Sequence, residues 1–155
     1  MQAGIQLYQY WKGRLETMGK IRTAWFSTFN LEISFFEKYI LSALMGIDAR
    51  DMSRPEDYET LSAALNADNA DEYMDVRVFY DAKQLMITGK AKLTAVDLHA
   101  MEAHRFGNTF AGGVFHPKVA LFENDQGQFW LLTGSFNMTL SGWARNRESF
   151  FLEPI

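Results

Sequence analysis

Residues 115–148 read FHPKVALFENDQGQFWLLTGSFNMTLSGWARNRE and carry the clearest structural signals in the chain. Two runs rich in apolar and aromatic residues, 115–122 and 128–133, predict two β-strands. The four residues between them, Asn-Asp-Gln-Gly at 124–127, are typical of a tight turn. This part of the sequence therefore predicts a β-hairpin.

On either side of the hairpin, helical periodicity alternates with strand-like runs. The predicted elements are a helix at 5–18, a strand at 22–28, a helix at 30–45 capped by Asn30, a short helix at 56–65, a strand at 74–80, a short helix at 139–145 and a closing strand at 147–152. Residues 82–97 give no clear signal beyond a helix interrupted by Gly89. Strands interleaved with helices indicate an α/β layered domain.

The bulk composition is that of one globular domain. The chain has 155 residues, of which 48% are hydrophobic, so it is long and apolar enough to bury a core. It contains no cysteine, which excludes disulfides and thiolate metal sites. We see neither a secretory signal nor an apolar run of bilayer length. We therefore expect a cytoplasmic protein without stable membrane insertion.

Charge is distributed unevenly along the chain. The formal net charge is −4, which argues against a protein that coats nucleic acid with its whole surface. Residues 46–81 contain ten acidic and three basic side chains, whereas 82–118 contain five basic side chains, two acidic ones and all three histidines. Two interpretations stay open: a locally positive cleft on an acidic body, or ordinary solvated faces.

Four polar side chains of the hairpin region are expected to converge. Side chains two apart on a strand share a face, so His116 and Lys118 project together. Ser135 and Asn137 follow the neighbouring strand, where a turn can direct both towards the same point. Taken alone, Ser135 and Asn137 also fit ordinary turn or cap residues. Together the four groups suit an oxyanion site.

The chemistry of these groups fits attack on a phosphate. Lys118 supplies positive charge, Ser135 and Asn137 supply neutral donors, and a neutral imidazole is a competent nucleophile when a carboxylate orients it. Glu148 is the candidate for that orienting role; its alternative is a surface ion pair with a neighbouring arginine. No carboxylate cluster suited to magnesium accompanies these residues, so the sequence predicts phosphoryl transfer with no metal and no cofactor.

These residues, in this order, resemble the phospholipase D superfamily. The matching pattern is His-x-Lys at 116–118, Gly-Ser-x-Asn at 134–137 and a glutamate eleven positions after the asparagine, at Glu148. The string GSFNMTLSGWARNRE resembles nuclease-type bacterial members most, and TAWFSTFNLEISFFEK at 23–38 resembles their first strand and helix. The resemblance implies a mixed β-sheet flanked by helices, forming one phospholipase D-like half.

One position departs from the usual pattern of that superfamily. An aspartate commonly follows the lysine at short distance, and here Glu123 and Asp125 are only approximate substitutes. Members such as the tyrosyl-DNA phosphodiesterases are active without that aspartate. The departure therefore leaves the expected site intact.

The resemblance also implies a two-step reaction that needs two copies of the motif. His116 would form a phosphohistidine, while a second histidine protonates the leaving alcohol and later activates water. This chain carries one copy. The other is expected from a twofold homodimer, with the two His116 side chains facing each other, or from sequence beyond Ile155.

Other residues near the motif have two interpretations each. Gly134, just after the predicted strand at 128–133, is a candidate substrate-binding residue. Arg105 is a candidate for contacting a substrate phosphate, against a structural or solvent-exposed role. Trp143 is a candidate for stacking on a base, against packing of its helix. His99 and His104 match no strong metal-ligand spacing, so we interpret them as loop or surface residues.

The sequence thus predicts a hydrolase of phospholipase D type: a metal-independent phosphodiesterase, and most specifically a nuclease or DNA-end-processing enzyme. Two alternatives remain open: a phospholipid hydrolase or transferase of the same superfamily, and a non-catalytic module that binds phosphate or nucleic acid. Residues 1–155 are predicted to form a single domain, which is either the whole protein or the amino-terminal part of a longer one.

Overall fold

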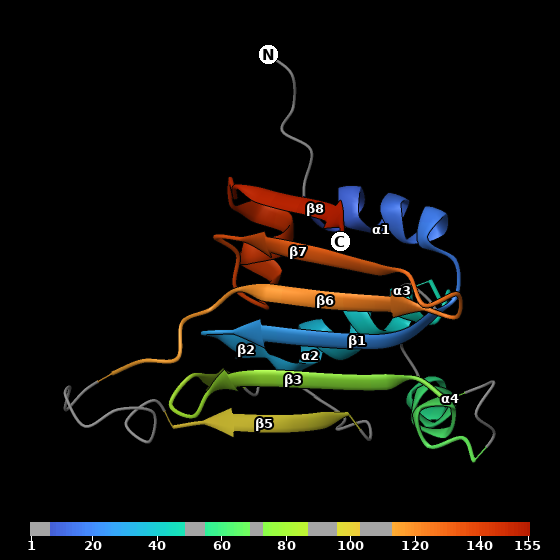
Figure 1. Ribbon diagram of the computed structural model, residues 1–155. Helices are drawn as coiled ribbons and strands as arrows, with labels where there is room; N and C mark the ends of the chain where they lie inside the picture. The colour runs from blue at the N-terminus through green and yellow to red at the C-terminus, as the bar shows by residue number, and fades with distance from the viewer. Residues whose placement is uncertain (1–6, 49–54, 69–72, 87–95, 103–112) are drawn as a thin grey trace.

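Six strands form one mixed β-sheet, in the order β5-β3-β1-β6-β7-β8 (Figure 1). The computed structural model describes residues 7–48, 55–68, 73–86, 96–102 and 113–155. The strands of this sheet are β1 (Ile21–Thr28), β3 (Asp75–Asp81), β5 (Asp97–Met101), β6 (Val119–Asn124), β7 (Phe129–Gly134) and β8 (Phe150–Pro154). The predicted fold class, a mixed sheet flanked by helices, is confirmed.

The remaining elements are helices and one small sheet. They are α1 (Leu7–Met18), β2 (Leu31–Glu32), α2 (Ile33–Phe35), the π-helix η1 (Phe36–Leu41), α3 (Ser42–Leu44), α4 (Pro55–Leu65), β4 (Leu85–Met86) and the π-helix η4 (Ser141–Arg145). Strands β2 and β4 pair in parallel as a separate two-stranded sheet. The π-helical turns are wider than α-helical ones, and such turns occur often near functional sites.

The strand directions place the carboxyl-terminal ends of several strands at the same edge of the sheet. Strand β1 runs parallel to β3, and β3 runs parallel to β5. The hairpin strand β6 is antiparallel to both β1 and β7, and β8 is antiparallel to β7. Strands β1, β3, β5 and β7 therefore end at one edge, where β6 and β8 begin; this edge is at the left in Figure 1. We call it the carboxyl edge.

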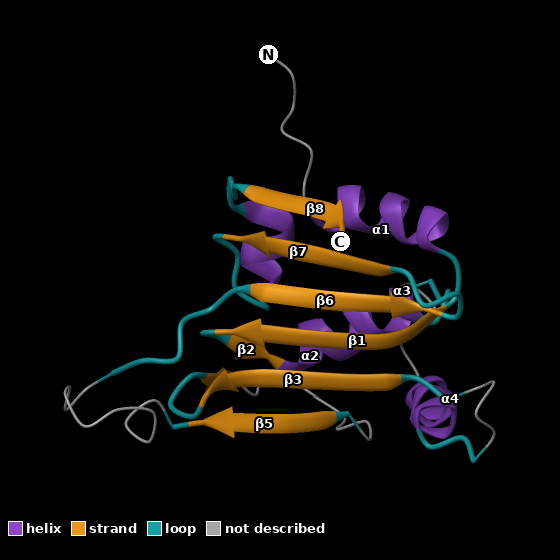
Figure 2. Ribbon diagram, viewed as in Figure 1, coloured by secondary structure: helices purple, strands orange, loops and turns teal. Residues whose placement is uncertain are grey.

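The core lies between the sheet and the helices on one of its faces (Figure 2). Along β1, Ala24 and Phe26 are buried while Trp25 and Ser27, on the opposite face, are half-buried. The ring of Phe26 packs edge-on against Phe36 of η1, with ring centroids 5.4 Å apart. Burial of this aromatic layer is the main term that fixes the helices on the sheet.

The predicted helix at 30–45 is wrong at its start. Leu31 and Glu32 instead form β2, because they pair with Leu85 and Met86 of β4. The first helical residue is Ile33, and Asn30 does not cap it. Tertiary pairing has overridden a local helix signal here.

Two strands also differ from their predicted bounds. The strand predicted from Phe115 begins at Val119, because Pro117 lacks an N–H for the ladder. Strand β5 was not predicted at all, and β8 begins at Phe150, three residues after the predicted start. His116 and Lys118 therefore precede β6 and do not lie within a strand.

Candidate active site

The residues singled out by the sequence gather at the carboxyl edge. His116 and Lys118 directly precede β6, Ser135 and Asn137 follow β7, and Glu148 precedes β8. Backbone hydrogen bonds join these connections: Gly134 N donates to Lys118 O at 3.2 Å, and Ser135 N donates to Ser149 O at 3.0 Å. The sheet topology thus brings together groups that are more than thirty positions apart in the sequence.

His116 and Lys118 are in direct contact. Lys118 Nζ lies 2.9 Å from Nδ1 and 3.1 Å from Nε2 of the His116 ring, so the ammonium can donate to the imidazole. The His116 ring also packs against Phe29, which follows β1, with ring centroids 4.8 Å apart. His116 is exposed, whereas only 8% of the Lys118 surface is exposed. An accessible imidazole therefore lies beside a buried positive charge.

Burial sets the electrostatics of Lys118. It lowers the pKa of Lys118 from its ordinary value because an ammonium is poorly solvated inside the protein. The negative charge of Glu148 acts in the opposite direction and raises the pKa. The two motifs are thus electrostatically coupled across the carboxyl edge, which gives Lys118 a nearby countercharge.

Glu148 is held by a local network. Ser135 Oγ donates to one carboxylate oxygen, and Asn146 Nδ2 donates to the other at 3.2 Å. The Ser149 amide donates to Ser135 Oγ at 3.2 Å, so the hydroxyl is held from both sides. Among the described residues, Glu148 makes no hydrogen bond to the His116 ring. The orientation of His116 by Glu148, expected from the chemistry of the sequence motif, is therefore not the arrangement observed.

Asn137 is oriented by the segment that follows β1. Its Oδ1 accepts from the backbone amide of Asn30 at 3.3 Å. The next residue, Met138, donates its amide to Thr28 Oγ1 at 2.9 Å and to Asn30 O at 3.2 Å. Because Oδ1 faces the Asn30 amide, the Nδ2 group of Asn137 is available as a donor.

Gly134 contributes through its lack of a side chain. A Cβ at this position would lie 2.4 Å from Ser149 O and under 3.0 Å from two ring atoms of Phe136. Only glycine allows β7 to approach the start of β8 this closely. Gly134 thus permits the connection on which Ser135 and Glu148 meet.

Two other described residues that the sequence singled out, Trp143 and His99, take no part in this arrangement. Trp143 is only 1% exposed and packs against Trp11 and Phe136, which leaves no face for a base, so we do not retain it as a substrate-binding residue. Arg105 and His104 lie outside the described residues. His99 is on β5, where it stacks on Phe79 and lies 3.0 Å from Asp97 Oδ2. In the described segments, no group of three His, Asp or Glu side chains could hold a metal ion.

Solved structures with the same arrangement of elements include two kinds of protein. One is the H432N mutant of yeast tyrosyl-DNA phosphodiesterase, with a TM-score of 0.58 and 12% sequence identity. The match covers 96% of this chain and 30% of the yeast chain. The other is NucT from Helicobacter pylori, with a TM-score of 0.54 and 12% sequence identity. This match covers 93% of this chain and 76% of the NucT chain. The chain has a phospholipase D-like fold.

The likeness in fold is not accompanied by a close sequence relationship. No protein-family model and no curated protein matches the sequence. The chain spans less than a third of the yeast enzyme, so it corresponds to only part of that larger protein. None of the helices in the described segments has the length and apolarity needed to cross a bilayer.

Within this phospholipase D-like fold, several residues that support the site were not identified from the sequence. Asp81 ends β3 and binds the amide of Phe115, and Thr28 ends β1 and binds the amide of Met138. Each stands at or directly after the end of a predicted strand, and the structure shows that these two strands are parallel, so both residues lie where α/β sheets place their binding groups. That position was the available signal for both.

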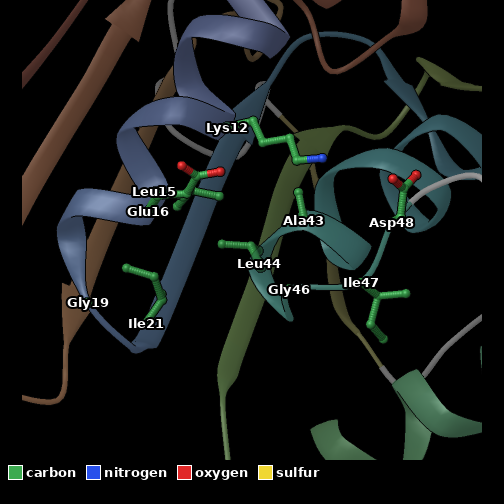
Figure 3. A pocket seen from close by; sticks show the side chains of 10 residues that line it. All are labelled: Lys12, Leu15, Glu16, Gly19, Ile21, Ala43, Leu44, Gly46, Ile47 and Asp48. Carbon is green, nitrogen blue, oxygen red and sulfur yellow. The ribbon is translucent and has the colours of Figure 1, made fainter.

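A cavity of about 380 Å³ lies near the start of β1, away from the carboxyl edge (Figure 3). It is formed between α1 and the end of α3, with Leu15 and Leu44 on its apolar wall and Lys12 and Glu16 at its rim. None of the predicted site residues lines it. The cavity is therefore distinct from the candidate active site.

Proposed function

We propose that this chain provides one half of a metal-independent phosphodiesterase site, in which His116 attacks phosphorus in a nucleic acid. The observation that carries the proposal is the His116–Lys118 pair, an exposed imidazole 2.9 Å from a buried ammonium, at the edge where Asn137 and Ser135 also lie. A nucleophile, a positive charge and the neutral amide donor of Asn137 at one edge suit attack on a phosphate.

In the first step, a ring nitrogen of His116 forms a bond to phosphorus as the bond from phosphorus to the leaving oxygen breaks. The product is a phosphohistidine. The leaving oxygen takes a proton from the equivalent histidine of a second motif, which acts as general acid. Attack and departure take place on opposite sides of phosphorus, so the two histidines must face each other across the substrate.

In the second step, water attacks the phosphohistidine. The second histidine, now neutral, takes a proton from the water as the new oxygen–phosphorus bond forms. The nitrogen–phosphorus bond breaks and returns the electron pair to His116. The phosphoryl group thus passes from the substrate to His116 and then to water, and the second histidine first gives up a proton and then regains one.

The other residues act on the charge of the phosphate. In this proposal Lys118 offsets negative charge on the non-bridging oxygens, and the Nδ2 group of Asn137 donates to them. Glu148 holds the Ser135 hydroxyl and supplies a countercharge to Lys118. Orientation of His116 by Glu148 would require the carboxylate to leave Ser135.

The second motif is proposed to come from a second copy of this chain or from another part of a longer polypeptide. In support, His116 is exposed at the carboxyl edge, where a facing histidine could approach it. A twofold axis near His116 would place two identical half-sites around one phosphate. The chain, which has a negative net charge, would then contact the substrate mainly through the carboxyl edge.

Nucleic acid is the proposed substrate class because of the named structural neighbours. One of them is called a tyrosyl-DNA phosphodiesterase, and the nuclease-like sequence string around Asn137 points to the same class. No described element favours a lipid surface over nucleic acid. A phospholipid substrate is therefore an outcome for experiment to exclude.

The experiment that tests this proposal measures cleavage in the presence of a chelator. Purified protein is incubated with end-labelled single- and double-stranded DNA in EDTA, and in parallel with vesicles of phosphatidylcholine. We expect DNA cleavage that persists in EDTA, together with an acid-labile phosphate label on the protein in rapidly quenched samples. Release of choline without DNA cleavage would instead identify a lipid enzyme, and cleavage abolished by EDTA would contradict the mechanism.

Lys118→Met is expected to lower activity and raise stability. Loss of the charge near the phosphate lowers kcat by about 10²-fold. The same change removes a buried ammonium, so the free energy of unfolding at pH 7 rises by about 1 kcal/mol.

The pH dependence of unfolding provides the second measurement for this variant. Because the pKa of Lys118 is lowered in the folded protein, the unfolded chain binds more protons between that pKa and the ordinary value of 10.5. Wild-type stability therefore gains a contribution as pH rises through this interval, and Lys118→Met lacks that contribution. Urea unfolding at pH 7 and pH 10 measures both effects; a variant less stable than wild type at pH 7 would contradict this reasoning.

A further inference from the structure

The carboxylate of Asp81 joins the end of β3 to the segment that carries His116. Asp81 is the last residue of β3 and is only 3% exposed. Its Oδ2 accepts from the amide of Phe115 at 2.8 Å, and its Oδ1 accepts from the amide of Lys83 at 3.0 Å. Both oxygens of a buried carboxylate are thus used by backbone amides, one of them adjacent to the nucleophile.

The register of the sheet shows why this contact reaches across a strand. Strand β1 lies between β3 and β6, and its last residue, Thr28, is aligned with Tyr80 of β3. Asp81 therefore stands one residue past the end of β1, where the chain turns away towards Phe29. At that point a side chain from β3 can reach the connection that leads into β6.

Few contacts with other described residues hold the segment around His116. Residues 113–118 belong to no strand, and Pro117 has no amide hydrogen to donate. Between described residues, two hydrogen bonds reach the backbone of 113–117. They are Phe115 N to Asp81 and the longer contact from Lys118 Nζ to His116 O, at 3.4 Å. The shorter of the two comes from Asp81.

We infer that Asp81 is a positioning residue, whose buried carboxylate fixes the backbone at Phe115 and thereby directs the His116 ring towards Lys118. A hydrogen bond from an amide to a charged carboxylate is stronger than one to a neutral carbonyl, and burial shields it from water. The consequence for activity depends on the proposed function; the consequence for the position of the His116 ring does not.

Asp81→Asn tests the inference with little change of shape. An amide side chain has one acceptor oxygen where the carboxylate has two, so only one of the two backbone amides keeps its partner. We expect the NMR signals of the His116 ring to shift and broaden, while the indole signals of the buried Trp11 and Trp143 stay in place. We also expect kcat to fall about 10- to 100-fold with KM changed less than about twofold.

Asp75→Asn is the matched control on the same strand. Asp75 also accepts two side-chain hydrogen bonds, from Trp25 Nε1 at 3.0 Å and from Arg77 Nε at 2.9 Å, but it begins β3 at the opposite edge. This variant is expected to keep the wild-type His116 signals and kcat. If Asp81→Asn does not fold, Phe115→Pro removes the same hydrogen bond from the donor side and carries the same expectations.

The possible results separate the two proposals. Wild-type His116 signals in a folded Asp81→Asn protein would overturn the inference, and so would equal changes in Asp75→Asn. If the wild-type protein cleaves no phosphodiester, the proposed function fails, yet the His116 spectra still decide the role of Asp81. Altered His116 signals with unchanged kcat would also overturn a positioning role in turnover.

Discussion

Replacing His116 with alanine is expected to lower kcat for phosphodiester cleavage by about 10³-fold or more, with loss of the phosphohistidine label. The variant lacks the atom that bonds to phosphorus, and neither Lys118 nor Asn137 can take over that role. Folding should be little affected, because the His116 side chain is exposed and its main ring contact is with Phe29. Cleavage of labelled DNA and circular dichroism measure the two effects.

The matched control is His99→Ala. His99 is half-buried and also packs on a phenylalanine, but it lies on β5, with its Nε2 3.0 Å from Asp97 Oδ2. We expect this variant to keep wild-type kcat. Equal loss of activity in both variants would show that the effect of His116→Ala is not chemical, and retention of activity in His116→Ala would remove the nucleophile from the proposal.

The same substitution also reports where the second histidine comes from. If two copies of this chain share one site, each site needs His116 from both subunits. Co-expression of equal amounts of wild-type and His116→Ala chains should then leave about a quarter of the wild-type activity, since random pairing gives that share of intact dimers. If each polypeptide carries its own second motif, about half of the activity should remain.

The part of the fold that the sequence predicted rests on strong local patterns. The hairpin of β6 and β7 was identified because apolar runs flank the turn at 124–127, and the structure places Gly127 there with φ of 72°. The strands β1 and β3 were identified from buried aromatic and β-branched residues. In each of these cases one local signal was sufficient.

The errors have a common physical origin in long-range pairing. Strand β5 has an ambiguous sequence and exists because it pairs with β3, from Arg77↔Asp97 to Asp81↔Met101. Strand β2 replaced the start of a predicted helix for the same reason, through its pairing with β4. No local pattern contains this information, since the partner residues are distant in the sequence.

The sequence singled out the residues of the candidate site but not the contacts that they make. Residue order and spacing identified His116, Lys118, Ser135 and Asn137, and the structure places all four at one edge. The spacing of these residues could not predict which side chain would hydrogen-bond to which. Glu148 accepts a hydrogen bond from Ser135, and Asp81 accepts one from the Phe115 amide, next to His116. Both contacts depend on how three connections, distant in the sequence, pack together.

Gly142→Ala is expected to show how closely two of these connections pack. A Cβ at Gly142 would lie 2.4 Å from the carbonyl oxygen of Asn137 and 2.9 Å from its amide nitrogen. Both are backbone atoms, so the clash cannot be relieved by rotating a side chain. Either η4 or the Asn137 backbone must move, and we expect the free energy of unfolding to fall by about 2–3 kcal/mol.

Activity should fall along with stability in this variant. The strain acts directly on the backbone of Asn137, whose Oδ1 is held by the Asn30 amide and whose Nδ2 is proposed to contact the phosphate. A displacement of the order of 1 Å lowers turnover by about 10²-fold. Guanidinium unfolding and kcat for DNA cleavage, the latter under conditions where the variant is fully folded, separate the two losses.

Gly13→Ala makes the same chemical change where space is available. Gly13 lies in the middle of α1, is exposed, and a Cβ there would meet nothing within 4 Å. Alanine reduces the backbone entropy lost on folding, so this variant should gain about 0.5–1 kcal/mol of stability and keep wild-type kcat. Opposite signs for the two substitutions would assign the Gly142 effect to its contact with Asn137. A loss of stability in both would mean that the close approach at η4 does not determine the result.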